Sequence, residues 1–257
     1  MLSSLVIAMV LGATSPGSAP ETLQVYGPGG PYPAMREAAA TFERTTGTQV
    51  KVTAGPTTEW ISQAKVDADL LYSGAETMMT DFVGAMDGQL RSEDAVPLYL
   101  RPSTILVRPG NPARIRGLKD LLAPGRRILV VNGSGQQGLW EDVAGRLGDL
   151  DTVKRFRANI QTFAKNSAEA KQAWVADPTL DAWLIWDIWQ VANPDLADAV
   201  PVEPEYRIYR DMGAVLTAQG KQKPAAVAFL DFLSSPEGEK IFMKWGWSRR
   251  AGRAAGR

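Results

Sequence analysis

The residues best suited to chemistry in this sequence are small or amide-bearing and lie in loops that follow apolar runs. Such loops occur at residues 27–31, 57–58, 73–74, 132–138 and 166–167. A helical pattern follows each loop, and the first N–H groups of a helix are unpaired and carry about half a positive charge. Several helix starts that face one gap would bind a small anion.

The same loops have a purely structural explanation. Three of them have the spacing of a capping box, in which side chains at the helix start bond to its free N–H groups. These pairs are Ser73 with Glu76, Ser134 with Gln137, and Asn166 with Glu169. Capping alone explains any single loop, whereas recurrence after successive strands favours a ligand.

The loop at residues 133–138 also fits the glycine pattern of a dinucleotide site, G-x-G-x-x-G. A dinucleotide site needs an acid at the end of the next strand to bind the ribose, and Lys165 and Asn166 stand there instead. A backbone nest for a small anion uses the same glycines more simply. No cofactor is therefore expected.

Arg101 is expected to supply the formal charge, because a guanidinium can pair with a carboxylate or an oxyanion through two hydrogen bonds. The alternative is an ordinary surface salt bridge. Trp186 is expected to line a cleft, whereas Trp183 and Trp189 are expected to lie in the core. The predicted ligand-binding residues are Gly29, Gly30, Thr58, Ser73, Arg101, Ser103, Asn132, Gly133, Ser134, Gly135, Gln136, Ser167, Trp186 and Asp187.

The composition excludes several classes of enzyme. The chain has 257 residues with no histidine and no cysteine, so a Ser-His-Asp triad, a thiol nucleophile and an imidazole or thiolate metal site are impossible. An enzyme that uses carboxylates such as Glu76, Glu141 or Asp187 remains an alternative, although no acid–base pair can be identified from their spacing. We expect no catalytic residue and no metal.

The charge balance argues against nucleic acid as a partner, because 28 basic residues face 28 acidic ones. Four arginines and no acid stand in the last nine residues. Because this end is also rich in glycine and alanine, we expect residues 248–257 to form a disordered basic tail.

The first 20 residues are expected to be a signal peptide for export to the periplasm. Residues 2–11 are almost continuously apolar, and Gly17 and Ala19 suit a cleavage site. No basic residue precedes the apolar run, so a buried N-terminal segment is the alternative.

Apolar patterns alternate between strand and helix along the rest of the chain. Met35, Ala38, Ala39 and Phe42 fall on one face of a helix that Gly47 ends. Repeated alternation of this kind predicts an α/β fold with mixed, mainly parallel sheets.

Later segments add a hinge and a helical end. Pro102 interrupts a strand-like run over residues 98–107, which predicts a crossover between lobes. The extended pattern returns at residues 206–216. Two helices, 224–233 and 236–245, then close the sequence, the second after a cap at Ser235.

Strings from these loops resemble the accessory colonization factor family of periplasmic solute-binding proteins. They include "VYGPGGPYPAM", "TAGPTTEW", "LYLRPSTILVRPGNP", "VVNGSGQQGLWED" and "NSAEAKQAW". The closing "AVAFLDFLSSPEGEKIFMKWGW" is similar to the end of molybdate- and sulfate-type binding proteins.

The resemblance implies a two-lobed, type II periplasmic-binding-protein architecture with two crossover strands. Lobe I would take residues 21–101 plus 205–247, and lobe II residues 102–204. The ligand would be a small anion, either an oxyanion such as sulfate or a small carboxylate or phosphorylated acid, for uptake by an ABC transporter or for chemosensing. The family also implies an alternative, a colonization or adhesion factor with a secondary cleft, and a possible homodimer.

Overall fold

Strands and helices alternate along the chain in the computed structural model, which describes residues 22–133 and 135–250. The strands are β1 (Thr22–Gly27), β2 (Gln49–Ala54), β3 (Leu70–Tyr72), β4 (Val96–Val107), β5 (Ile128–Val131), β6 (Ile160–Ala164), β7 (Ala182–Trp186), β8 (Asp198–Pro201) and β9 (Tyr209–Leu216). The helices are α1 (Tyr32–Thr46), α2 (Thr57–Asp67), α3 (Glu76–Ala85), α4 (Leu139–Gly145), α5 (Leu150–Asn159), α6 (Ser167–Ala176), α7 (Ile188–Ala192), α8 (Pro224–Ser234) and α9 (Pro236–Lys244).

Two groups of strands share β4. Sheet A has the order β2-β1-β3-β9-β4, and sheet B the order β4-β7-β5-β6, with β8 also paired to β4. β1 runs parallel to β2 and β3, and β5 runs parallel to β6 and β7. β4 and β9 run antiparallel to their neighbours. The predicted α/β fold with mixed sheets flanked by helices is confirmed.

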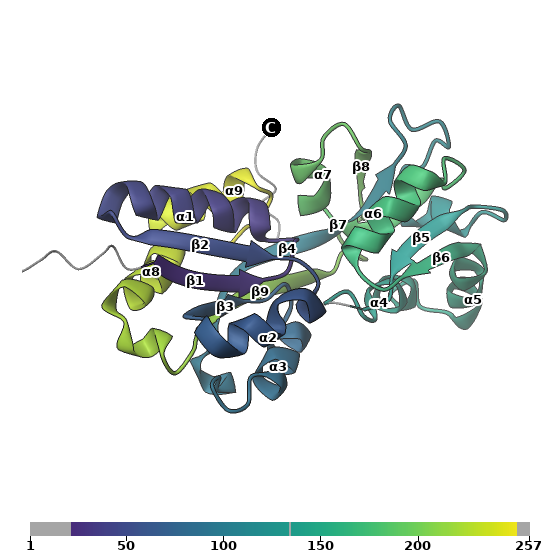
Figure 1. The fold of residues 1–257 in the computed structure, drawn as a ribbon. Helices are drawn as coiled ribbons and strands as arrows, with labels where there is room; N and C mark the ends of the chain where they lie inside the picture. The colour runs from purple at the N-terminus through teal and green to yellow at the C-terminus, as the bar shows by residue number, and fades with distance from the viewer. Residues whose placement is uncertain (1–21, 134, 251–257) are drawn as a thin grey trace, which may run out of the picture.

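β4 changes partner at its middle. Arg101 and Pro102 pair with β9 in sheet A, whereas Ser103 already pairs with Trp186 of β7 in sheet B. The strand is continuous, and the predicted interruption at Pro102 is instead the point where the pairing changes. Figure 1 shows β4 and β9 running between a left half, which holds β1–β3, and a right half, which holds β5–β7. β4 and β9 thus lie where the two predicted lobes would meet, and the exact lobe boundaries remain predictions.

Helices cover both faces of sheet A. α1, α8 and α9 lie on one side and α2 and α3 on the other (Figure 1). The residues predicted for one face of α1 are buried, and Gly47 ends that helix with a φ of 76°, the left-handed conformation that glycine adopts without strain. The Ser235 hydroxyl accepts a hydrogen bond from the Gly238 N–H at 3.1 Å, so the predicted cap of α9 is confirmed.

The chain ends bear on two predictions. Ser248 is buried and pairs with Leu100 through two backbone hydrogen bonds, of 2.6 and 2.9 Å. The first residues of the expected tail therefore pack against sheet A. The rest of that tail, residues 251–257, and the expected signal peptide lie outside the described residues.

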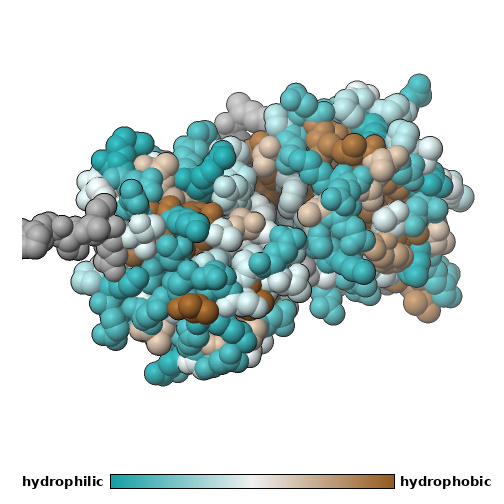
Figure 2. All heavy atoms as spheres, viewed as in Figure 1, coloured by the Kyte–Doolittle hydropathy of each residue, from teal (hydrophilic) through white to brown (hydrophobic). Residues whose placement is uncertain are grey.

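The surface view in Figure 2 is mainly hydrophilic, with apolar residues in separate small groups. The large apolar side chains exposed in the described part of the chain are Val66, Leu150, Val175 and Val227. None of the helices within residues 22–133 and 135–250 is long and apolar enough to span a membrane.

Candidate functional site

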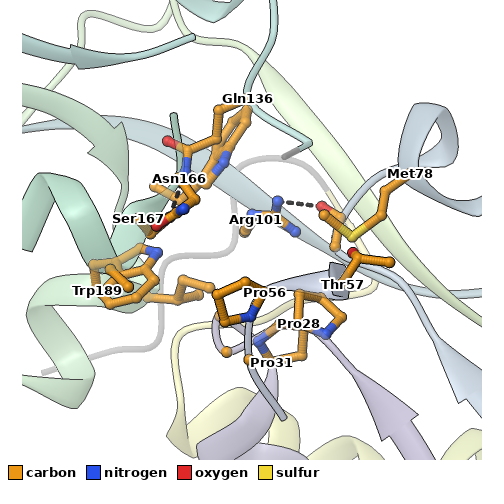
Figure 3. A pocket seen from close by; sticks show the side chains of 17 residues that line it. Pro28, Pro31, Pro56, Thr57, Met78, Arg101, Gln136, Asn166, Ser167 and Trp189 are labelled. Atoms are coloured by element: carbon orange, nitrogen blue, oxygen red, sulfur yellow. Dashed lines mark hydrogen bonds between the residues drawn. The ribbon is translucent and has the colours of Figure 1, made fainter. Parts of the chain in front are cut away.

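A cavity of about 90 Å³ lies where β4 passes from sheet A to sheet B. Residues 28–31, 55–57 and 166–168 line it, and these segments lead into α1, α2 and α6. The remaining lining residues are Gly74, Met78, Arg101, Gln136, Trp186, Ile188 and Trp189. Figure 3 shows Arg101 between the prolines of the first two segments and the polar Gln136 and Ser167.

Part of the predicted ligand-binding set is brought together at this cavity. These residues are Gly29, Gly30, Arg101, Gln136, Ser167 and Trp186. They come from both sheets and from loops far apart in sequence, because the carboxyl ends of parallel strands meet at one edge. Ser134 lies outside the described residues.

Two predicted serines are not at the cavity surface. Ser73 is buried, and its hydroxyl oxygen accepts a hydrogen bond from the Gly213 N–H at 3.2 Å. Ser103 is also buried, and its hydroxyl oxygen accepts a hydrogen bond from the Ile208 N–H at 3.0 Å. Both side chains attach neighbouring segments to β9 or to the residue before it, so their hydroxyl oxygens have protein partners away from the cavity.

Two predicted glycines act through close packing. A Cβ on Gly133 would lie 2.6 Å from the carbonyl oxygen of Lys165, so only glycine allows these loops to approach so closely. Gly135 has a φ of 75°, and a Cβ there would lie 3.3 Å from both Ala75 and Met78. Gly133 is therefore packed against the segment just before α6, and Gly135 against the start of α3.

Asn132 and Thr58 are exposed and do not line the cavity. The neighbour of Thr58, Thr57, lines it instead, because α2 begins at Thr57. The sequence prediction missed Thr57 by one position, and the boundary of α2 was the signal that could have identified it.

We expect Thr57→Val to weaken anion binding about three- to tenfold, since it removes one hydroxyl donor from the cavity wall. Thr58→Val, on the adjacent exposed residue, is the matched control and should leave affinity unchanged. Isothermal titration calorimetry measures both. Equal losses in the two variants would contradict the assignment of Thr57 to the cavity.

One of the three tryptophans does not lie where it was predicted. Trp183 is fully buried as expected, but Trp189, expected in the core, is only partly buried and lines the cavity. Trp186 lines it too, and its indole N–H is buried with no hydrogen-bond partner in the described residues.

The guanidinium of Arg101 is the main electrostatic feature of the cavity. Arg101 is only 4% exposed and lies against the rings of Trp186 and Trp247, with its Cζ 4.7 and 4.9 Å from their centroids. It donates hydrogen bonds to two backbone carbonyls, those of Gly74 and Asp211. Its Nε has no partner among the described residues, and no carboxylate of that part of the chain is within ion-pair distance.

Burial lowers the pKa of Arg101 to about 9, against the opposing effect of the Asp211 and Asp187 carboxylates. The side chain thus remains charged at neutral pH. A buried cation without a counter-ion is costly, so the geometry favours an anionic occupant of the cavity.

The helix starts at the cavity also favour an anion. The N-cap residues of α1 and α2 are Pro31 and Pro56, which make no side-chain capping bond. Of the predicted capping boxes, Asn166 with Glu169 forms in part: the Asn166 Oδ1 accepts the Glu169 N–H at 2.9 Å, whereas the Glu169 carboxylate accepts from the Lys165 N–H at 3.4 Å. The Ser73 box does not form, because that hydroxyl bonds to Gly213 instead.

Asp187 lies beside the cavity without lining it. Its N–H donates to the carbonyl oxygen of Pro102 at 3.2 Å, and its buried Oδ1 has no partner in the described residues. Burial raises the pKa of Asp187 to about 7, although the Ile188 N–H and the charges of Arg101 and Arg207 oppose the shift.

Comparisons with known proteins agree with this architecture. Residues 23–248 match the family described as bacterial extracellular solute-binding protein. Peb3 from Campylobacter jejuni is 35% identical, with a TM-score of 0.83, over 89% of this chain and 100% of that one. A structure of PEB3 bound to L-phospholactate has the same identity and coverage and a TM-score of 0.84. None of the curated proteins matches.

More distant structures share the fold. The sulfate-binding protein SubI from Mycobacterium tuberculosis is 20% identical, with a TM-score of 0.72, over 90% of this chain and 88% of that one. The periplasmic molybdate-binding protein of Azotobacter vinelandii is 18% identical, with a TM-score of 0.64, over 89% and 99% of the two chains. The fold of a type II periplasmic binding protein is confirmed, and this chain belongs to the family of bacterial extracellular solute-binding proteins.

Proposed function

We propose that this protein is a periplasmic receptor that encloses a small organic anion, a phosphorylated or carboxylic acid, between two lobes. The observation that carries the proposal is the buried Arg101 guanidinium at the cavity, which has no carboxylate within ion-pair distance in the described residues. The bound anion would be the counter-ion that the protein does not itself provide.

The size of the cavity limits the group that binds there. A cavity of about 90 Å³ is smaller than the roughly 150 Å³ space that accepts benzene in an engineered protein core. It therefore accommodates a phosphoryl or carboxylate head beside Arg101. The Arg101 guanidinium and the uncapped start of α2 would donate hydrogen bonds to that head.

The wall of the cavity favours a ligand that also has a carbon part. Met78, Ile188 and Trp189 contribute apolar surface next to the polar groups. L-phospholactate is bound by PEB3, the 35% identical relative, whereas the sulfate and molybdate binders are 20% identical or less. We therefore favour a small phosphorylated acid over a bare oxyanion.

Export, and delivery of the ligand to an ABC transporter, form the rest of the proposal. Membership of an extracellular solute-binding family supports both. The ligand would leave unchanged, because the chain has no histidine or cysteine and its relatives are binding proteins.

We expect L-phospholactate at about 100 times its Kd to stabilise the dialysed protein by about 2.7 kcal/mol, a rise in Tm of roughly 5–10 °C. Differential scanning fluorimetry measures the shift. Sulfate and molybdate should shift Tm less at equal concentration, and glycerol, which has no charge, should not shift it. If no phosphorylated or carboxylic acid raises Tm, the proposal is wrong.

A further inference from the structure

Gln136 and Ser167 form a polar pair in the wall of the cavity. Gln136 is 2% exposed and lies in the loop between β5 and α4, and Ser167 is the first residue of α6. The Gln136 Nε2 donates a hydrogen bond to the Ser167 hydroxyl oxygen at 2.5 Å, the dashed contact in Figure 3. Both residues line the cavity.

The backbone holds this contact in place. The Gln136 N–H donates to the carbonyl oxygen of Gly133 at 3.0 Å, and the Leu139 N–H donates to the carbonyl oxygen of Gln136 at 3.0 Å. Gly133 packs directly on the backbone of Lys165, two residues before Ser167. The main chain of Gln136 is fixed by these contacts, and its side chain, only 2% exposed, has little room to reach another partner.

The direction of the hydrogen bond decides what Ser167 can do. A serine hydroxyl has one hydrogen to donate and two lone pairs. Because its oxygen accepts from the Gln136 amide, the hydroxyl hydrogen points elsewhere, and no acceptor for it exists among the described protein atoms. Asn166 already caps α6 by accepting the Glu169 N–H, so Ser167 is not needed there. The Ser167 hydroxyl is thus available to donate into the cavity.

The free end of Gln136 is an acceptor and does not suit an anion. Its Oε1 is buried and has no partner in the described part of the chain. An anion that approached it would face a carbonyl oxygen. Gln136 therefore fits a role behind the binding surface better than a role as a direct ligand contact.

We propose that Gln136 is a positioning residue that orients the Ser167 hydroxyl as a hydrogen-bond donor to the anion, on the wall opposite α1 and α2. This inference rests on the proposed function. It assigns the direct contact with the anion to Ser167 and an indirect role to Gln136, so substitutions of the two residues should not have independent effects on affinity.

A double-mutant cycle tests the proposal. Ser167→Ala, Gln136→Met and the double variant are titrated with L-phospholactate by calorimetry, beside the wild type. We expect Ser167→Ala to weaken binding about tenfold and Gln136→Met about five- to tenfold, the loss of one hydrogen bond. The double variant should bind no more weakly than Ser167→Ala alone, because Gln136 acts only through Ser167.

Two further variants separate positioning from structure. Gln136→Glu replaces the amide donor by a carboxylate that would accept a hydrogen bond from the Ser167 hydroxyl. We expect a loss of affinity of more than 100-fold with an unchanged far-UV circular dichroism spectrum. Gln137→Met, on the exposed neighbour of Gln136, is the matched control and should bind like the wild type. If Gln136→Met does not fold, Gln136→Leu takes its place in the cycle.

If the losses of affinity in the two single variants multiply in the double variant, Gln136 contacts the ligand itself. If Ser167→Ala binds like the wild type, Ser167 does not contact the ligand. Either result overturns the inference while the proposed function stands. If the wild type binds neither L-phospholactate nor any other small anion, the proposed function fails and the inference falls with it.

Discussion

Arg101→Met is expected to lower the affinity for the anion at least 100-fold and to leave the protein folded. The guanidinium supplies the formal positive charge of the cavity wall, and a hydrogen bond from a charged donor contributes about 1.5–3 kcal/mol. Two such bonds together correspond to the expected loss. Calorimetric titration with L-phospholactate measures it.

The stability of unliganded Arg101→Met should stay within about 2 kcal/mol of the wild type, because two effects oppose each other. Removing a buried cation that has no counter-ion relieves a desolvation cost. The carbonyls of Gly74 and Asp211 lose a donor, which costs about 1–3 kcal/mol for each group that becomes unsatisfied. Methionine has a similar length and can remain between Trp186 and Trp247.

Two control variants make the result specific. Arg101→Lys keeps the charge and loses the planar fork, so we expect an intermediate loss of about tenfold. Arg44→Met removes an exposed arginine on α1 and should not change affinity. An Arg101→Met protein that binds the anion normally would remove Arg101 from the site and leave the proposed function without its main support.

The local parts of the fold were predictable because they depend on neighbours in sequence. The buried face of α1, its end at Gly47 and the cap at Ser235 follow from spacing and capping preferences alone. The position of Arg101 was predictable for a related reason: Pro102 marks the point where β4 leaves one partner for another.

The roles of several site residues were not predictable because their partners are distant in sequence. Ser73 and Ser103 have the right type for anion donors, but the backbone N–H groups of Gly213 and Ile208, more than 100 positions away, donate hydrogen bonds to their hydroxyl oxygens. Trp189 is only partly buried because it lies in the first turn of α7, a helix of five residues that begins at the cavity. A pattern of residue types cannot show which polar group finds a protein partner and which remains for a ligand.

Asp187→Asn is expected to stabilise the protein at pH 8 and to have little effect near pH 4. Burial raises the pKa of Asp187 to about 7 from an ordinary value of 3.8. A carboxyl with a raised pKa binds its proton more tightly in the folded state than in the unfolded state, so the free energy of unfolding falls as pH rises from about 4 to about 7. Asparagine cannot ionise and avoids this loss.

The expected gain at pH 8 is roughly 2–4 kcal/mol, because one pKa unit corresponds to about 1.4 kcal/mol and partial solvent contact screens some of it. Urea denaturation of both proteins at pH 4.5 and pH 8 measures the difference. Asp195→Asn, on an exposed carboxylate, is the matched control and should show no such pH dependence. A gain of equal size at both pH values would mean that ionisation of Asp187 is not its cause.

Ionisation of the Asp187 carboxyl should also make the affinity for the anion depend on pH. Asp187 stands between Trp186 and Ile188, which both line the cavity, so a bound anion and an ionised Asp187 repel each other. The affinity of the wild type for L-phospholactate should therefore fall between pH 6 and pH 8. In Asp187→Asn this fall should be smaller, because the repelling charge is absent and only the ionisation of the ligand itself remains to change affinity with pH.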